Sequence, residues 1–130
     1  MLKIAHNNEA MAKILNDFGV FDHEESMYHQ ILPRFEQLYA NAGKQVKFAP
    51  TAFKFDKDPG EDNVLLEDLR NRQYQTICRN KGLDEEHLKA ALVKLAEFHA
   101  ASACYVEHYG MYSEKMVKGA FVESNRAVMV

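Results

Sequence analysis

The sequence predicts a mixed α+β fold, in which a small antiparallel sheet is combined with helices. Apolar residues recur at helical spacing over residues 9–43, whereas β-branched and aromatic residues are concentrated over residues 46–67. A long alanine-rich segment over residues 85–108 again has helical spacing. The 130 residues, 47% hydrophobic and 27% charged, belong to the ordinary globular class and suffice for one domain with a core, not for two.

The first segments are predicted to be a strand end and a short helix. Residues 1–5 are typical of the end of a strand, and residues 6–8 favour a turn with a helix N-cap. A helix is predicted from Glu9 to Asp17, and Gly19 is its stop signal. Its apolar residues at helical spacing are Met11, Ile14, Leu15 and Phe18.

A second and longer helix is predicted to begin near Phe21 and to end at Gly43. Acidic residues stand in its first turn, where the helix dipole favours them. Pro33 would remove a hydrogen bond in mid-helix, so a kink or a new helix is expected there. The apolar face comprises Phe21, Tyr28, Ile31, Leu32, Phe35 and Leu38.

An antiparallel hairpin is predicted over residues 46–67. Its strands are Val46–Phe55 and Asn63–Glu67, with a turn at Pro59 and Gly60. Residues 70–83 are expected to be irregular. Asp84 then caps a helix from Glu85 to about His108, and Gly110 ends it.

The long helix carries an apolar stripe and many alanines, so it is expected to be covered on more than one side. The stripe consists of Leu88, Leu92, Leu95, His99, Ser102 and Val106. Since His99 lies on this apolar face, it is interpreted as a core histidine and not as a catalyst. The tail, residues 110–130, is weakly patterned.

Composition and motifs exclude several classes of function. The net charge of −3 comes without any run of Lys or Arg, which argues against nucleic-acid binding. Cys78 and Cys104 lack the spacing of a disulfide framework or a zinc site. No apolar run could span a bilayer and no secretory signal is recognisable, so a cytoplasmic protein is expected. Glycine-rich phosphate loops are absent, and Met27 stands where a His-Glu zinc motif needs its second histidine.

Three strings nevertheless resemble one family in the expected order. They are FDHEESMYHQILPRFEQLYANAGKQVKFAP, VLLEDL and GLDEEHLKAALVKLAEFHAASA, and the family is that of the ecdysteroid-kinase-like proteins. The resemblance implies a protein-kinase-like fold, related to choline and aminoglycoside kinases. It also implies ATP- and Mg²⁺-dependent phosphorylation of a small alcohol such as an ecdysteroid. Nucleotide and small-molecule substrate are therefore the expected partners.

The resemblance assigns nucleotide-binding roles to two groups of residues. Lys3 takes the place of the lysine that holds the α- and β-phosphates, and Glu24 that of the helix glutamate paired with it. Glu25 lies roughly 100° further around the helix, so only one of the two can face Lys3. Glu67, Asp68 and Leu69 match the hinge, whose backbone meets the adenine edge. The alternative interpretation is that these are ordinary surface charges and a polar strand end.

The resemblance also implies a truncated kinase-like domain spanning residues 1–130. Its parts are an N-lobe remnant and hinge (1–69), a connector (70–83), the first C-lobe helix (84–109) and a tail (110–130). The sequence starts two residues before Lys3, and its last aspartate is Asp84. The aspartates that orient the acceptor and hold the metal are thus missing, so this chain alone is not expected to be a competent kinase.

Two further expectations follow from the long helix. If on the order of 500 Å² of its apolar face is bare, roughly 12 kcal/mol of burial is forgone, which favours marginal stability or self-association through residues 84–109. The alternative function is therefore a non-catalytic, pseudokinase-like interaction module that uses this helix. A purely helical structural protein is disfavoured by the β propensity of residues 46–67.

Overall fold

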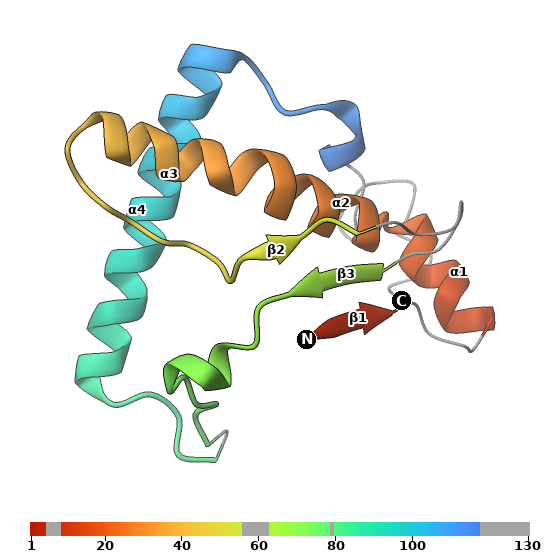
Figure 1. Cartoon of the computed structure of the whole chain (residues 1–130), viewed down its shortest axis with the longest axis horizontal. Helices are drawn as coiled ribbons and strands as arrows, with labels where there is room; N and C mark the ends of the chain where they lie inside the picture. Colours follow the sequence, from red (N-terminus) through yellow and green to blue (C-terminus); the bar gives the residue numbers. More distant parts are fainter. Residues whose placement is uncertain (5–8, 56–62, 79, 118–130) are drawn as a thin grey trace. The chain divides into compact units, whose positions relative to one another are not determined.

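The computed structural model describes residues 1–4, 9–55, 63–78 and 80–117 (Figure 1). These residues form two compact units. The first comprises the described parts of residues 1–31, 51–67 and 111–130, and the second comprises the described parts of residues 32–50 and 68–110. The predicted turns at residues 6–8 and 59–60, and most of the tail, lie outside the described residues. Among the described residues, no helix has the length and apolar character needed to cross a membrane.

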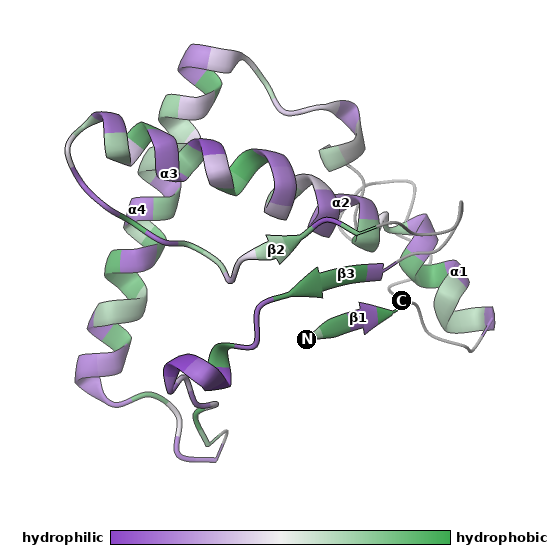
Figure 2. Cartoon of the chain, in the orientation of Figure 1, coloured by the Kyte–Doolittle hydropathy of each residue, from purple (hydrophilic) through white to green (hydrophobic). Residues whose placement is uncertain are grey.

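The first unit contains an antiparallel sheet with the strand order β1-β3-β2 (Figure 1). The strands are β1 (Leu2–Ile4), β2 (Ala52–Phe53) and β3 (Asn63–Leu66). The central strand β3 is mainly hydrophobic, as Figure 2 shows. Val64 and Leu66 are 3% and 2% exposed, since alternate residues of a strand point to the same face. The Met1 backbone extends the pairing of β1, because its carbonyl accepts a 2.8 Å hydrogen bond from the Leu66 N–H.

The predicted hairpin is present, but its first strand is much shorter than expected. Only Ala52 and Phe53 pair with β3, opposite Leu66 and Leu65 respectively. The prediction of a strand over Val46–Phe55 was therefore wrong for residues 46–51 and 54–55.

The side chains and backbone of this segment explain the shortening. The Phe48 N–H donates to a carboxylate oxygen of Glu36 at 3.1 Å, in place of a strand partner. The Phe48 ring packs against Phe35, with ring centroids 6.2 Å apart. Pro50 has no N–H to contribute to a ladder. Side-chain packing and proline chemistry thus override the β propensity of this stretch.

The helical part of the first unit follows the prediction closely. Helix α1 (Glu9–Asp17) has the predicted bounds, although none of its residues is buried. Gly19 has a φ of 63°, a left-handed conformation that glycine adopts without a Cβ penalty. Helix α2 (Val20–Ser26) follows immediately, and it contacts β3.

The expected disturbance at Pro33 is also present. A π-helical turn, η1 (Met27–Ile31), precedes helix α3 (Leu32–Asn41), so that Pro33 occupies the second residue of α3. Because the helical segment continues from α2 through η1 into α3, Pro33 still removes one backbone hydrogen bond, and the wider π-turn before it accommodates its ring. The described segment 70–83 is not irregular throughout, because Leu69–Arg72 form a 3₁₀ turn, η2.

The second unit is held together by aromatic side chains between α3 and helix α4 (Glu85–Tyr109). Phe35, which is 0% exposed, lies at the centre. Its ring makes edge contacts with Phe98 at 5.3 Å and with Tyr105 at 5.7 Å between centroids. The Tyr39 hydroxyl also donates to the Glu97 carbonyl at 3.0 Å. Figure 1 shows α3 crossing α4, as this packing requires.

Asp84 caps α4 as predicted, since its carboxylate accepts a 2.8 Å hydrogen bond from the His87 N–H. The same carboxylate contacts the His87 Nδ1 at 2.7 Å. Hydrogen bonding between the two residues lowers the pKa of Asp84 and raises the pKa of His87. The charged pair is therefore favoured at the beginning of the helix.

The apolar stripe of α4 is only partly covered by the described residues. Leu88, Leu92 and Leu95 are 47%, 55% and 51% exposed. The interpretation of His99 as a core histidine was wrong, because His99 is exposed. The reason is that α3 packs on the opposite face of α4, where Ala101 is 3% exposed.

Candidate functional site

The candidate site in the first unit is built around Lys3, the middle residue of β1. Lys3 pairs with Val64 of β3 in antiparallel register. Residues that are directly opposite in such a pair project to the same face of the sheet. Since Val64 is buried and α2 contacts β3, the Lys3 side chain rises on the face that α2 covers.

Glu24 of α2 holds the Lys3 ammonium with both carboxylate oxygens. The Nζ of Lys3 lies 2.8 Å from Oε1 and 3.1 Å from Oε2. The side chains are 37% and 30% exposed, so the pair is neither buried nor freely solvated. The hydrogen bond to Glu24 is the main cause that raises the pKa of Lys3. Of the two candidate glutamates, it is Glu24 that meets Lys3, while Glu25 is exposed.

Tyr28 is a second neighbour of the ammonium that the sequence did not single out as a site residue. Its ring centroid lies 5.9 Å from the Lys3 Nζ, within cation–π range. Tyr28 follows Glu24 by four residues, and such residues share one face of a helix. That spacing was visible in the sequence, but the position of Lys3 beside it depends on the sheet.

Glu67 ends the β2–β3 hairpin and is tied to Thr51 by two hydrogen bonds. Its N–H donates to the Thr51 carbonyl at 2.8 Å, and its carboxylate accepts from the Thr51 N–H at 3.1 Å. The Glu67 N–H is thus engaged within the first unit. Residues 67 and 68 also mark a boundary between the two compact units.

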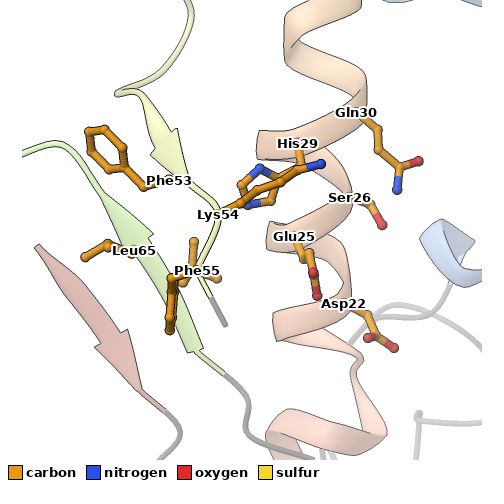
Figure 3. Close-up of a pocket in the computed structure, with 10 residues that line it drawn as sticks. Asp22, Glu25, Ser26, His29, Gln30, Phe53, Lys54, Phe55 and Leu65 are labelled. Atoms are coloured by element: carbon orange, nitrogen blue, oxygen red, sulfur yellow. The ribbon is translucent and has the colours of Figure 1, made fainter. Parts of the chain in front are cut away.

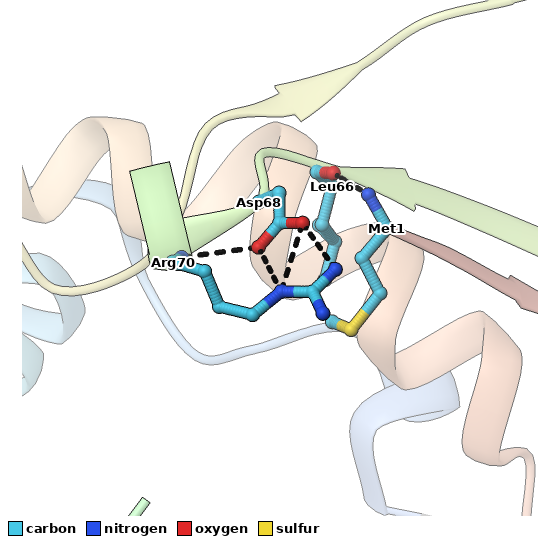
Figure 4. A network of polar contacts seen from close by, with 4 residues as sticks. All are labelled: Met1, Leu66, Asp68 and Arg70. Atoms are coloured by element: carbon cyan, nitrogen blue, oxygen red, sulfur yellow. Dashed lines mark hydrogen bonds and ion pairs between the residues drawn. The ribbon is translucent and has the colours of Figure 1, made fainter. Parts of the chain in front are cut away.

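Asp68 and Leu69, in the second unit, begin the 3₁₀ turn. The Asp68 carboxylate accepts from the Arg70 N–H at 3.0 Å and binds the guanidinium through Nε and Nη2, the latter at 2.6 Å (Figure 4). Hydrogen bonds from Arg70 lower the pKa of Asp68 to about 2. The carbonyl of Leu69 accepts from the Tyr74 N–H at 3.2 Å. The Asp68 side chain is therefore committed to Arg70.

The opposite face of α2 lines a hollow of about 430 Å³, which Figure 3 shows. Its strand side is mainly apolar and its helix side polar. The lining residues are Asp22, Glu25, Ser26, His29, Gln30, Phe53, Lys54, Phe55, Val64 and Leu65. None of the predicted site residues lines this hollow.

The structure thus brings together Lys3 and Glu24 in one unit, and it places Glu67 at the hairpin end of the same unit. It describes Asp68 and Leu69 as part of the other. Among the described residues, no group of three or more His, Cys, Asp or Glu side chains could hold a metal ion.

These features define a mixed α+β chain in which a carboxylate from a helix holds a lysine on a strand. The model of the Ecdysteroid kinase-like family matches residues 1–130, and the chain belongs to this family. The predicted resemblance is thereby confirmed, and with it a kinase-like family membership. Neither a curated protein nor a solved structure matches the chain.

Proposed function

We propose that this chain is the ATP-binding part of a kinase that phosphorylates a small hydroxyl compound, an ecdysteroid or another small alcohol. The observation that supports this most is the contact of the Lys3 ammonium with both carboxylate oxygens of Glu24. A lysine that must hold phosphates needs a fixed position, and a carboxylate behind it provides one. Membership in a family of small-molecule kinases supports the same role.

The geometry of Lys3 suits a phosphate group. An ammonium has three N–H donors, and the two oxygens of Glu24 accept at most two of them. At least one donor is therefore left for a phosphate oxygen, and the partial exposure of Lys3 gives access to it. Lys3 is charged at neutral pH, because the ordinary pKa of lysine lies well above 7 and the hydrogen bond to Glu24 raises the pKa of Lys3 further. When bound, ATP supplies the phosphoryl group. Among the described residues, no cluster of His, Cys, Asp or Glu side chains fits a metal ion.

Backbone hydrogen bonds limit which groups of the hinge, residues 67–69, could contact the adenine edge. The Glu67 N–H donates to Thr51, and the carbonyls of Asp68 and Leu69 accept from the Asn71 and Tyr74 N–H groups, so the backbone groups that the resemblance assigns to the adenine edge are already partly engaged. The Asp68 carboxylate, held by Arg70, would serve to shape this turn and would make no contact with the base.

A titration of the purified chain with a non-hydrolysable ATP analogue tests the proposal. We expect saturable binding, followed by calorimetry, that Lys3→Ala weakens by about 10- to 100-fold, as for the loss of a hydrogen bond to a charged group. Glu24→Gln should weaken binding less, because the ammonium remains but is less well held. The matched control is Lys89→Ala, since Lys89 also pairs with a glutamate, Glu85, at 2.6 Å.

Equal affinities of wild type and Lys3→Ala would contradict the assignment of Lys3. A folded wild-type chain that binds no nucleotide at millimolar concentration would contradict nucleotide binding itself. Circular dichroism of each variant establishes that it is folded.

A second candidate function, an interaction module, is favoured by the exposed stripe on α4. Leu88, Leu92 and Leu95 are each about half exposed and follow one another at spacings of four and three residues. This spacing is the one at which two helices pack along a seam. We therefore infer that a second copy of the chain covers this stripe.

The strength of such a dimer can be bounded. Burying the exposed halves of three leucines contributes roughly 3 kcal/mol per copy, or about 6 kcal/mol per dimer. At the low end of the association cost, about 4 kcal/mol, roughly 2 kcal/mol is left, which corresponds to a dissociation constant of tens of millimolar. Sedimentation equilibrium of the wild type at about 1 mM should therefore show an average mass only a few per cent above that of the monomer. Leu92→Glu should abolish this excess mass, whereas Lys89→Glu, beside the stripe, should not. A wild type that stays monomeric throughout would exclude this inference.

A further inference from the structure

Tyr28 lies where it can act on Lys3, although it has no place in the function proposed above. The Lys3 Nζ is 5.9 Å from the centroid of the Tyr28 ring and 2.8 Å from Glu24 Oε1. The ammonium thus has a carboxylate and an aromatic face as neighbours, both supplied by the helical segment 20–31. Tyr28 is half-buried, so its side chain is partly shielded from water.

The local backbone brings the two groups to the same lysine. Glu24 belongs to α2, whereas Tyr28 is the second residue of the π-helical turn η1. Such a turn is uncommon, since it replaces regular helical hydrogen bonds, and it is frequently found at functional sites. The two residues, four apart, share one helix face, and Lys3 is opposite them because β1 pairs with β3.

We propose that Tyr28 is a positioning residue for Lys3, holding the ammonium over its ring so that it stays beside Glu24 while it binds phosphate. The role rests on the proposed nucleotide-binding function of Lys3. The flexible four-carbon stem of lysine would otherwise let the ammonium swing away from Glu24. A ring face attracts a cation whether or not it carries a hydroxyl. The aromatic ring, and not the phenol oxygen, is therefore the group of Tyr28 that positions the Lys3 ammonium.

The test compares Tyr28→Leu with Tyr28→Phe in the full chain and first uses no nucleotide. The rate of reductive methylation at Lys3 is measured by peptide mass spectrometry, with Lys89 as an internal reference. Tyr28→Leu should raise the Lys3 rate relative to Lys89 about two- to fivefold, as expected for losing one partly exposed cation–π contact. Tyr28→Phe should leave it at the wild-type value. Affinity for the ATP analogue should then fall by a similar factor in Tyr28→Leu alone.

The outcomes distinguish a failure of the positioning role of Tyr28 from a failure of the proposed nucleotide binding. An unchanged Lys3 rate in Tyr28→Leu, or an equal rise in Tyr28→Phe, would overturn the positioning role. A loss of far-UV circular dichroism in Tyr28→Leu would show general unfolding and would also overturn it. If the Lys3 rates follow the expected order but the wild type binds no nucleotide, the contact is real and the proposed function fails.

Discussion

Replacing Phe35 with alanine is expected to lower the free energy of unfolding by about 3–5 kcal/mol, the usual cost of removing a buried phenylalanine side chain. Phe35 is 0% exposed, and its ring makes edge contacts with three other aromatic rings. A cavity in this cluster loses apolar burial as well as aromatic pairing, which contributes about 0.5–1.5 kcal/mol per pair. Since small domains have only about 5–15 kcal/mol to lose, much of the second unit's stability would disappear.

The measurement is urea unfolding followed by far-UV circular dichroism, because the chain has no tryptophan for fluorescence. Phe53→Ala is a matched control, since Phe53 is 47% exposed and the same atoms are removed. We expect it to cost no more than about 1.5 kcal/mol. A loss below about 1.5 kcal/mol for Phe35→Ala would mean that the aromatic cluster is not the core of the second unit.

The second large effect is expected for Leu66→Ala, which should lower the free energy of unfolding by about 2–5 kcal/mol. Leu66 is 2% exposed and ends the central strand of the sheet, where its N–H also donates to the Met1 carbonyl. Truncation would loosen β3, the only described strand that pairs with both of the others. Because β1 carries Lys3, the contact with Glu24 should weaken together with the sheet.

Two control variants make the test of Leu66→Ala more specific. Leu66→Met keeps the volume and should cost less than about 1.5 kcal/mol. Leu92→Ala removes the same atoms from a side chain that is 55% exposed, and it should cost less than about 1.5 kcal/mol. Similar losses for Leu66→Ala and Leu92→Ala would contradict the assignment of Leu66 to the core.

Local signals in the sequence were sufficient for most of the helices. Gly19 and Asp84 are a stop signal and a cap whose chemistry acts within a few residues, so the bounds of α1 and α4 could be predicted to within one residue. The disturbance near Pro33 was predictable for the same reason. The wrong predictions, the length of the first hairpin strand and the burial of His99, depended on distant neighbours. Phe48 is drawn to Phe35 and Glu36, and α3 covers only one face of α4.

For the candidate site, too, local sequence signals predicted some features, while others depended on residues that are distant in the sequence. The family resemblance, carried by short strings of residues, was enough to select Lys3 and Glu24 and to prefer Glu24 over Glu25. It could not reveal that Tyr28 stands beside the same ammonium, nor that Glu67 is tied to Thr51 and Asp68 to Arg70. The sequence by itself determined the family, the caps and the helical periodicity, because these are local in the chain. Only the tertiary structure decided which side chains meet Lys3, because that depends on the pairing of β1 with β3, some 60 residues away.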